Sequence, residues 1–144
     1  VLGATKKLGE VITLNQGKGY IVVRFGNVMD SRGSLLKIWQ RQMDKGLPLT
    51  ITDERMSRYM MTIPEASNLV IEAAARGEGG EIFVLDMGKR VNIKELAFEI
   101  LQKAGKKPEI EVIGMRPGET LTEDLMTEEE WSRAVKEDKF YVIR

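Results

Sequence analysis

The sequence predicts an α/β fold, because apolar, β-branched segments alternate along the chain with segments of helical period. Residues 20–28 (YIVVRFGNV) and 81–86 (EIFVLD) are the clearest strands. Their nearly continuous apolar character is typical of strands buried on both faces of a parallel sheet. The length of 144 residues suits one domain that is large enough to bury a core.

The first half of the chain is expected to contain two helices and two strands. In chain order they are a helix over 3–15, a strand over 20–28, a helix over 34–45 and a short strand over 49–52. The spacing of Leu8, Val11 and Ile12 indicates the first helix. Ser34 is a suitable N-cap for the second helix, which Gly46 and Pro48 end.

The second half is expected to continue the alternation. In chain order it contains a charged loop and extended piece over 53–61, a helix over 64–76, a strand over 81–86, a helix over 92–103, a half-exposed strand over 109–113, a short helix over 127–136 and a strand over 139–144. Pro64 suits the first helical position, where its missing N–H has no helical partner to lose. Asn92 is a suitable N-cap for the next helix.

Composition and charge exclude several classes of function. Lys+Arg and Asp+Glu both number 22, and this zero net charge argues against a nonspecific nucleic-acid binder. The chain has no Cys and no His, so a disulfide scaffold, a Cys/His zinc site and a His-based triad are excluded, and we expect no metal site. A general base within the chain must therefore be Asp, Glu, Lys or Tyr. No apolar run approaches the ~20 residues of a membrane span, and we expect a cytoplasmic protein.

Two clusters could bind an anion, and each also has an ordinary structural interpretation. Asn27 ends the first strand, and the helix that begins near Ser34 would present free N–H groups. An ordinary strand-to-helix turn explains these two residues equally well. In the segment 53–59, Arg55 and Arg58 could clamp a diphosphate, because guanidinium groups match phosphate oxygens. A surface loop that pairs them with the adjacent acids is the commoner arrangement.

Two further clusters carry charge at expected turns. Arg116 and Glu119 flank Pro117-Gly118, and together they could bind phosphate and ribose hydroxyls. The alternative is a self-paired turn, which contributes little. Lys6 lies in the first turn of the first helix, where a lysine is usually just solvated.

The order of these motifs is more specific than any one of them. GATKK, RFGNV, SRGS, TDERMSRYMMT, GGEIFVLDMG and RPGE together resemble the extended short-chain dehydrogenase/reductase superfamily, in its polysaccharide-biosynthesis branch of nucleoside-diphosphate-sugar 4,6-dehydratases and epimerases. The resemblance runs from Leu2 to at least Leu125. It implies the C-terminal, sugar-nucleotide-binding portion (residues 1–144) of a Rossmann-like enzyme, with the last strands of the parallel sheet and the small substrate-binding domain. We expect the NAD(P)-binding half, with its Gly-rich turn, to lie before residue 1.

The resemblance also implies a role for residues at both ends of the cofactor and substrate cleft. Lys6 matches the lysine of the family's Tyr-x-x-x-Lys motif, which holds the nicotinamide ribose of NAD or NADP. The tyrosine position falls on Leu2, which cannot transfer a proton, so the catalytic base is left open. Asp30 stands where a glycine is usual.

The residues that the family uses to contact its substrate have matches in this sequence. Asn27 and Arg58 match residues that contact the substrate diphosphate, and Arg55 is a neighbour of the second. Arg116 and Glu119 match the pair that contacts phosphate and the uridine ribose. The resemblance thus implies a UDP-sugar substrate, UDP-N-acetylglucosamine or a relative.

The resemblance leaves the activity open in two respects. It does not separate a 4,6-dehydratase from an epimerase, and a non-catalytic sugar-nucleotide-binding or oligomerisation module is the alternative from another class. We expect the 144-residue chain to lack turnover alone. We also expect it to self-associate, because strands that lose their neighbours expose an apolar edge.

Overall fold

The computed structural model describes residues 2–144 and clusters into two compact units. Unit 1 combines the residues up to Phe25 with Pro64–Asp86 and Asp124–Arg144, and unit 2 combines Gly26–Ile63 with Met87–Glu123. The length had suited one domain. The division could not be seen in the sequence, because each unit is assembled from segments far apart in the chain.

Unit 1 is built around a four-stranded sheet with the order β1-β6-β10-β9. Its strands are β1 (Val22–Arg24), β6 (Ile82–Leu85), β10 (Phe140–Ile143) and β9 (Val135–Glu137). β1 runs parallel to β6, whereas β10 is antiparallel to both β6 and β9. The fold class is therefore mixed α/β, and its central strand β6 is buried as its sequence predicts.

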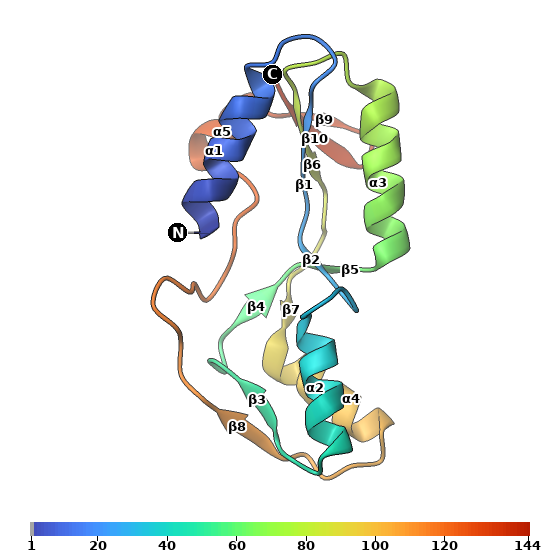
Figure 1. Ribbon diagram of the computed structural model, residues 1–144, viewed down its shortest axis with the longest axis vertical. Coiled ribbons are helices and arrows are strands. Elements are labelled where there is room, and N and C mark those ends of the chain that lie inside the picture. The colour runs from blue at the N-terminus through green and yellow to red at the C-terminus, as the bar shows by residue number, and fades with distance from the viewer. Residues whose placement is uncertain (1) are drawn as a thin grey trace. The chain divides into compact units, whose positions relative to one another are not determined.

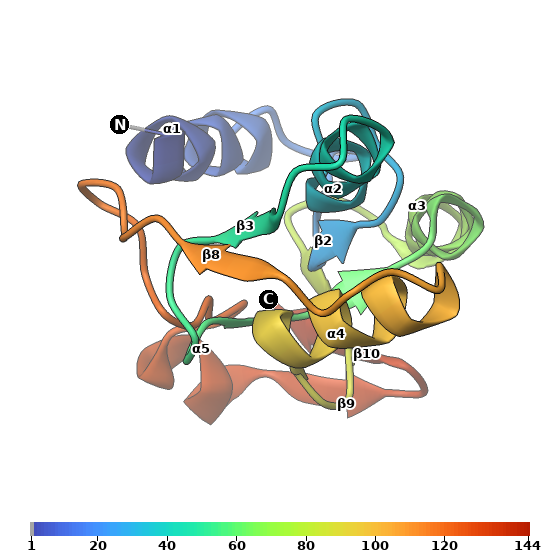
Figure 2. The ribbon, with the colours of Figure 1, turned by 90° about the horizontal axis from the view of Figure 1, so that it is seen from below.

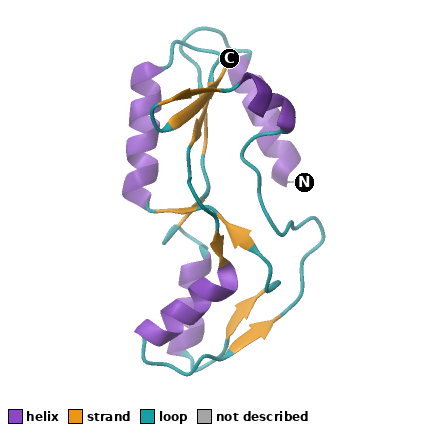
Figure 3. Cartoon of the chain, turned by 180° about the vertical axis from the view of Figure 1, so that it is seen from behind, coloured by secondary structure: helices purple, strands orange, loops and turns teal. Residues whose placement is uncertain are grey.

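Three helices accompany this sheet, namely α1 (Leu2–Leu14), α3 (Ile63–Arg76) and α5 (Glu128–Arg133). Figures 1 and 3 show α1 and α3 on opposite sides of the strands. Phe83 and Phe140 pack edge to face in the core, with ring centroids 5.6 Å apart. α1 exposes Leu8, Val11 and Ile12, and the expected self-association stays a prediction.

Unit 2 packs two helices on short strand pairs. The helices are α2 (Leu35–Asp44) and α4 (Ile93–Lys103), and the pairs are β3 (Leu49–Ile51) with β8 (Ile110–Val112), β4 (Ser57–Arg58) with β7 (Val91–Asn92), and β2 (Asn27–Val28) with β5 (Met60–Met61). Trp39, Leu49 and Ala97 are fully buried in its core. Figure 2 shows the parallel strands β3 and β8 side by side.

The helix predictions for residues 3–15, 34–45, 64–76 and 92–103 are confirmed to within about two residues at each end. Asn92 caps α4 by accepting a hydrogen bond from the Glu95 N–H at 3.0 Å. Ser34 occupies the N-cap position of α2, but its side chain makes no capping hydrogen bond. No helix in the described residues is both long enough and apolar enough to span a bilayer.

The prediction of one buried strand over 20–28 is wrong. The segment forms β1 and β2, which belong to different sheets, and β1 is half-buried at the edge of its sheet. The break is at Gly26, where a Cβ atom would lie 2.5 Å from the Tyr59 carbonyl oxygen. Asn27 N–H then donates to that carbonyl at 2.7 Å, which starts the pairing of β2 with β5.

The charged loop and extended piece expected over 53–61 contain the short strands β4 and β5, whose backbones pair with strands that are distant in sequence. One other expectation needs correction. The helix expected over 127–136 ends at Arg133. The chain then forms β9 and turns back into β10 through Asp138, whose positive φ of 59° suits a tight turn.

Gly26→Ala is expected to destabilise the protein by roughly 1–3 kcal/mol, because the added methyl group would meet backbone atoms that cannot move aside. Urea unfolding measures the loss. Gly9→Ala is the control: a Cβ atom there meets nothing within 4 Å in an exposed helix, so a gain of about 0.5–1 kcal/mol is expected. Equal stability of Gly26→Ala and wild type would show that the close approach to Tyr59 is not restrictive.

Candidate functional site

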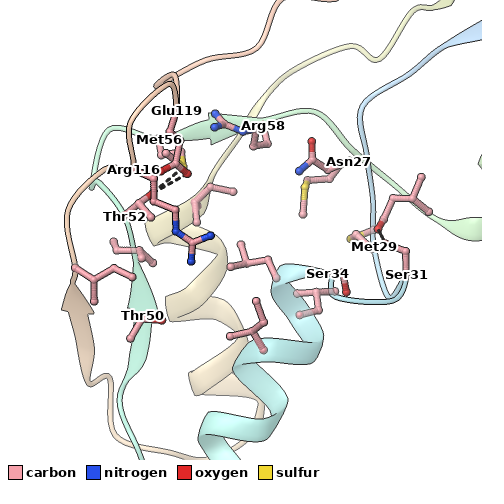
Figure 4. Close-up of a pocket in the computed structure, with 18 residues that line it drawn as sticks. Asn27, Met29, Ser31, Ser34, Thr50, Thr52, Met56, Arg58, Arg116 and Glu119 are labelled. Atoms are coloured by element: carbon pink, nitrogen blue, oxygen red, sulfur yellow. Dashed lines mark hydrogen bonds between the residues drawn. The ribbon is translucent and has the colours of Figure 1, made fainter. Parts of the chain in front are cut away.

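A pocket of about 350 Å³ lies wholly within unit 2. Its wall is formed by the end of β2 and the turn into α2, by the ends of β3 and β4, and by the segment that follows β8 (Figure 4). Its polar side chains include Asn27, Ser31, Ser34, Thr52, Arg58, Arg116 and Glu119, and its apolar side chains include Leu35, Ile38, Ile51, Met56, Met60 and Ile113. The pocket thus has one polar region and a largely apolar remainder.

The N-terminus of α2 opens into this pocket. The Ser34 N–H donates to Ser31 O at 3.0 Å, and the first helical bond joins Ile38 N–H to Ser34 O at 3.1 Å. The N–H groups of the first turn, from Leu35 to Lys37, therefore have no partner within the helix. The Ser34 hydroxyl is buried and likewise lacks a hydrogen bond within the described residues. This end of α2 offers several donors and the positive end of the helix dipole.

The turn at 116–119 is closed by hydrogen bonds between Arg116 and Glu119 that do not use the Arg116 guanidinium. Glu119 N–H donates to Arg116 O at 3.0 Å, and Arg116 N–H donates to the Glu119 carboxylate, also at 3.0 Å. Thr52 donates its hydroxyl hydrogen to the other carboxylate oxygen at 3.3 Å. Within residues 2–144 the Arg116 guanidinium has no hydrogen bond or ion pair, and Figure 4 shows it pointing into the pocket.

The Arg58 guanidinium also lines the pocket, but its donors are largely used. Arg58 is 7% exposed. Nη1 donates to Ser57 O and Leu121 O, both at 2.8 Å, and Nη2 donates to Thr120 O at 2.7 Å. Nε lies 3.6 Å from a carboxylate oxygen of Glu123. The two arginines predicted to contact a diphosphate therefore differ sharply in what they can still bind.

Arg55 is not brought to the pocket. It is exposed, and its guanidinium forms two hydrogen bonds to Asp53, at 3.0 Å from Nε and 2.8 Å from Nη2. The hydrogen bonds from Arg55 lower the pKa of Asp53 to about 2. Of the two interpretations of this segment, the surface ion pair describes Arg55.

Asn27 lies at the pocket wall, on β2. Its backbone N–H is bound to Tyr59 O, while its side-chain amide makes no hydrogen bond with the residues that the structure describes. The amide is therefore available to a ligand. No spacing in the sequence indicated that Thr52, Met56 and Met60 would join Asn27 in one wall, because they reach it from different strands and loops.

Lys6 lies on α1 in unit 1, and its side chain is exposed. It does not line the pocket of unit 2. Leu2, at the tyrosine position, begins α1, but its side chain is outside the described part of the structure. The cofactor role expected of Lys6 stays a prediction.

Sequence inspection missed a buried ion-pair network in unit 1. Arg24 donates two hydrogen bonds to Glu10 at 2.7 Å, two to Glu130 at 2.8 and 2.9 Å, and one to Leu125 O at 3.0 Å. The side chains of Arg24 and Glu130 are only 12% and 6% exposed. An arginine within an otherwise apolar strand was the available signal, since a buried cation requires partners.

Comparison with known proteins places this chain in a family. The family described as "Polysaccharide biosynthesis protein" matches residues 1–144. The capsular polysaccharide biosynthesis protein CapD of Staphylococcus aureus is 48% identical over 138 residues, which are 90% of this chain and 23% of the relative.

Solved structures agree with this result. Pen from Bacillus thuringiensis superposes with a TM-score of 0.87 at 36% identity, covering 98% of this chain and 47% of that one. The Thermus thermophilus UDP-glucose 4-epimerase, solved with NAD, shares the fold with a TM-score of 0.68 at 24% identity, covering 85% of this chain and 43% of that one. The chain thus spans about a quarter of the length of the curated relative and about half of the solved chains. It belongs to the polysaccharide biosynthesis protein family, whose relatives are extended short-chain dehydrogenase/reductases of the epimerase kind.

Proposed function

We propose that the pocket of unit 2 binds a UDP-sugar, UDP-N-acetylglucosamine or a close relative, as part of an NAD(P)-dependent 4,6-dehydratase or epimerase of surface polysaccharide synthesis. The observation that carries the proposal is the free Arg116 guanidinium in the same pocket as the uncapped N-terminus of α2. Arginine forks and helix N-termini are both suited to phosphate groups. Their coincidence favours a diphosphate as the ligand.

The rest of the pocket fits the remainder of a nucleotide. Its volume of about 350 Å³ is within the usual range of ~300–1,000 Å³ for small-molecule sites. Ile38, Ile113 and Met60 offer an apolar surface for a base. The free amide of Asn27 can donate to the diphosphate, and the Glu119 oxygens keep lone pairs that can accept from ribose hydroxyls.

The names of the relatives support the class of reaction. The family and CapD are named for polysaccharide and capsule synthesis, and the Thermus enzyme is named as a UDP-glucose 4-epimerase with NAD. Bound NAD(P) would supply reversible acceptance of a hydride. Lys6 fits a role at that cofactor's ribose, because its exposed ammonium makes no ion pair in the described residues.

UDP binding tests the proposed ligand directly. Calorimetry on the 144-residue chain is expected to show that UDP binds at least ~10-fold more tightly than uridine, because the diphosphate contributes charge-assisted hydrogen bonds. Arg55→Ala is the matched control. It removes an exposed cation outside the pocket and should leave UDP affinity unchanged. Equal affinity for UDP and uridine, or no affinity for either, would refute the assignment of the ligand.

Lys6→Ala tests the proposed cofactor role in the full-length protein. It is expected to lower NAD(P) affinity by ~10-fold or more, as loss of a charge-assisted hydrogen bond should. UDP affinity should not change, because the UDP pocket lies wholly in unit 2 whereas Lys6 lies in unit 1. Fluorescence titration with NADH and calorimetry with UDP separate the two effects. Normal cofactor affinity in Lys6→Ala would mean that Lys6 is only a solvated surface lysine.

A further inference from the structure

We infer that Gln42, together with Trp39, is a positioning residue that fixes the N-terminal end of α2 relative to the β3 wall of the same pocket. Both side chains act through Thr50 of β3, and neither lines the pocket itself. The expected effect on UDP rests on the proposed function. The hydrogen-bonded bridge formed by Gln42, Trp39 and Thr50 belongs to the fold of unit 2, with or without a ligand.

Every polar group of Thr50 is bound by a side chain of α2. The Thr50 N–H donates to Gln42 Oε1 at 3.1 Å, and Gln42 Nε2 donates to the Thr50 hydroxyl at 2.9 Å. The Trp39 indole N–H donates to Thr50 O at 2.9 Å, and Trp39 is fully buried. Three hydrogen bonds thus join one residue of β3 to two residues that are neighbours on one face of α2.

The bridge covers the edge of β3 that faces away from β8. On the paired edge, Leu49 N–H donates to Glu109 O at 3.0 Å, and Ile51 O accepts from Ile113 N–H at 2.9 Å. Because backbone groups alternate between the two edges of a strand, the N–H and C=O of Thr50 point to the other edge. In the described residues β3 pairs with β8 alone. Side chains of α2 therefore take the place that a second strand would have.

These hydrogen bonds specify the position of α2 along β3 more sharply than the surrounding core does. Met43 and Leu49 pack with Trp39 in the core of unit 2. Apolar contacts of this kind are non-directional, whereas hydrogen bonds act only within a narrow range of distance and angle. The Gln42 amide binds both the N–H and the hydroxyl of Thr50, so it sets the register between the helix and the strand.

The two elements that the bridge joins carry different parts of the pocket (Figure 4). α2 brings the buried Ser34 hydroxyl and the free N–H groups of its first turn. β3 leads into Thr52, which donates its hydroxyl hydrogen to Glu119 at 3.3 Å in the turn that carries Arg116. The bridge therefore sets the separation between the donors of α2 and the Arg116 guanidinium, which would bind one diphosphate from two sides.

Gln42→Leu tests this role, because it removes two of the three hydrogen bonds of the bridge. In the full-length protein, UDP affinity is expected to fall by about 10-fold, since the two sets of donors are no longer preorganised for one diphosphate. Uridine lacks the diphosphate, and its affinity should stay within about twofold of wild type. Calorimetry with each ligand measures both. Unchanged UDP affinity, or equal losses for UDP and uridine, would overturn the inference.

Gln40→Leu is the matched control for this experiment. Gln40 lies on the same helix, is exposed, and donates to Asp44 of that helix at 2.8 Å. The same chemical change there leaves the bridge to Thr50 intact, so neither UDP nor uridine affinity should change. A loss of UDP affinity in Gln40→Leu as large as that in Gln42→Leu would also overturn the inference, because any change on this face of α2 would then have the same effect.

The amide of Thr50 reports the bridge without a ligand. Its N–H donates to Gln42, so in Gln42→Leu it is expected to exchange with solvent at least ~10-fold faster. The Leu49 amide, which donates to Glu109 O, should keep its protection. Unchanged exchange at Thr50 would overturn the inference whatever UDP does. Faster exchange at Thr50 in a protein that binds neither UDP nor uridine would support the bridge and refute only the proposed function.

Two polar variants cover the case in which the leucine variant does not fold. In Gln42→Glu the carboxylate can accept from the Thr50 N–H, and the Thr50 hydroxyl can turn to donate to the second oxygen. UDP affinity and Thr50 exchange should therefore stay near wild type. Gln42→Asn keeps the amide on a stem one methylene shorter, so it should lose both as Gln42→Leu does. Wild-type UDP affinity in Gln42→Asn, or a 10-fold loss in Gln42→Glu with slow Thr50 exchange, would contradict the positioning role.

Discussion

Arg116→Ala is expected to weaken UDP binding by about 10- to 100-fold, which corresponds to roughly 1.5–3 kcal/mol for a charge-assisted contact to phosphate. This substitution is expected to remove a ligand contact without removing a contact that holds the fold together. The guanidinium has no partner among the described residues, and the turn is closed by the backbone of Arg116 and by Glu119. The folded state should therefore be as stable as wild type, and the loss should appear in affinity alone.

Calorimetry with UDP measures the expected loss of affinity, and urea unfolding of the same sample measures the expected unchanged stability. Arg55→Ala is the control, since Arg55 is an exposed arginine whose partner, Asp53, lies outside the pocket. Arg116→Lys should recover part of the affinity, because an ammonium keeps the charge but not the bidentate geometry. An Arg116→Ala variant that binds UDP like wild type would remove the observation on which the proposed function rests.

The sequence placed all three candidate arginines near a phosphate, but it could not rank them. Arg55 is paired with Asp53 two residues away, a local contact that the alternative interpretation anticipated. Two of the three acceptors of Arg58 are carbonyls 62 and 63 residues further along the chain, and the third belongs to the adjacent Ser57. Backbone carbonyls have no signature in a sequence. Whether a guanidinium is free or used is therefore decided by tertiary contacts, and only the structure separates Arg116 from Arg58.

The distinction between local and tertiary contacts also decides which elements of the fold could be predicted. The helices could be predicted because their period and their caps, such as Asn92, are local properties. The prediction of one strand over 20–28 was wrong because the break at Gly26 depends on Tyr59, which approaches from a distant segment. The pairing of the two-residue strands of unit 2, β2 with β5 and β4 with β7, could not be predicted for a similar reason. Two residues on each side give no periodic signal, and their pairing is fixed by partners elsewhere in the chain.

Arg24→Met is expected to cost unit 1 about 3–5 kcal/mol of stability, because removal of one partner of a buried ion pair leaves the other charges uncompensated. All five N–H groups of Arg24 are bound, four of them to the carboxylates of Glu10 and Glu130. Lys7 lies within 3.4 Å of both carboxylates but is 58% exposed, so it cannot replace the lost guanidinium. Methionine keeps much of the volume, which isolates the loss of charge and hydrogen bonds.

The network also sets a pH dependence. The hydrogen bond from Arg24 lowers the pKa of Glu130 to about 2, against burial, which raises it. For Glu10, burial raises the pKa, but the hydrogen bond and the charge of Arg24 outweigh it and the pKa is lowered. A carboxyl with a depressed pKa stabilises the fold fully above its unfolded value, here 4.5, and loses that contribution as the pH falls towards 2. Wild type should therefore lose stability steeply between pH 4.5 and 2, and Arg24→Met should lose less over the same interval.

Urea unfolding at pH 7 and at pH 3, with hydrogen exchange of β6 and β10 to follow unit 1, measures both effects. Arg133→Met is the control, because Arg133 lies in the same unit and its ion pair with Glu129 is long, at 4.0 Å, and exposed on both sides. Such a pair contributes at most ~0.5 kcal/mol. If Arg24→Met costs no more than Arg133→Met at pH 7, the network adds nothing to stability. The partners of Arg24 would then be adequately solvated without it, and the depressed pKa of Glu130 would need another cause, such as the N–H of Thr127 that also donates to its carboxylate.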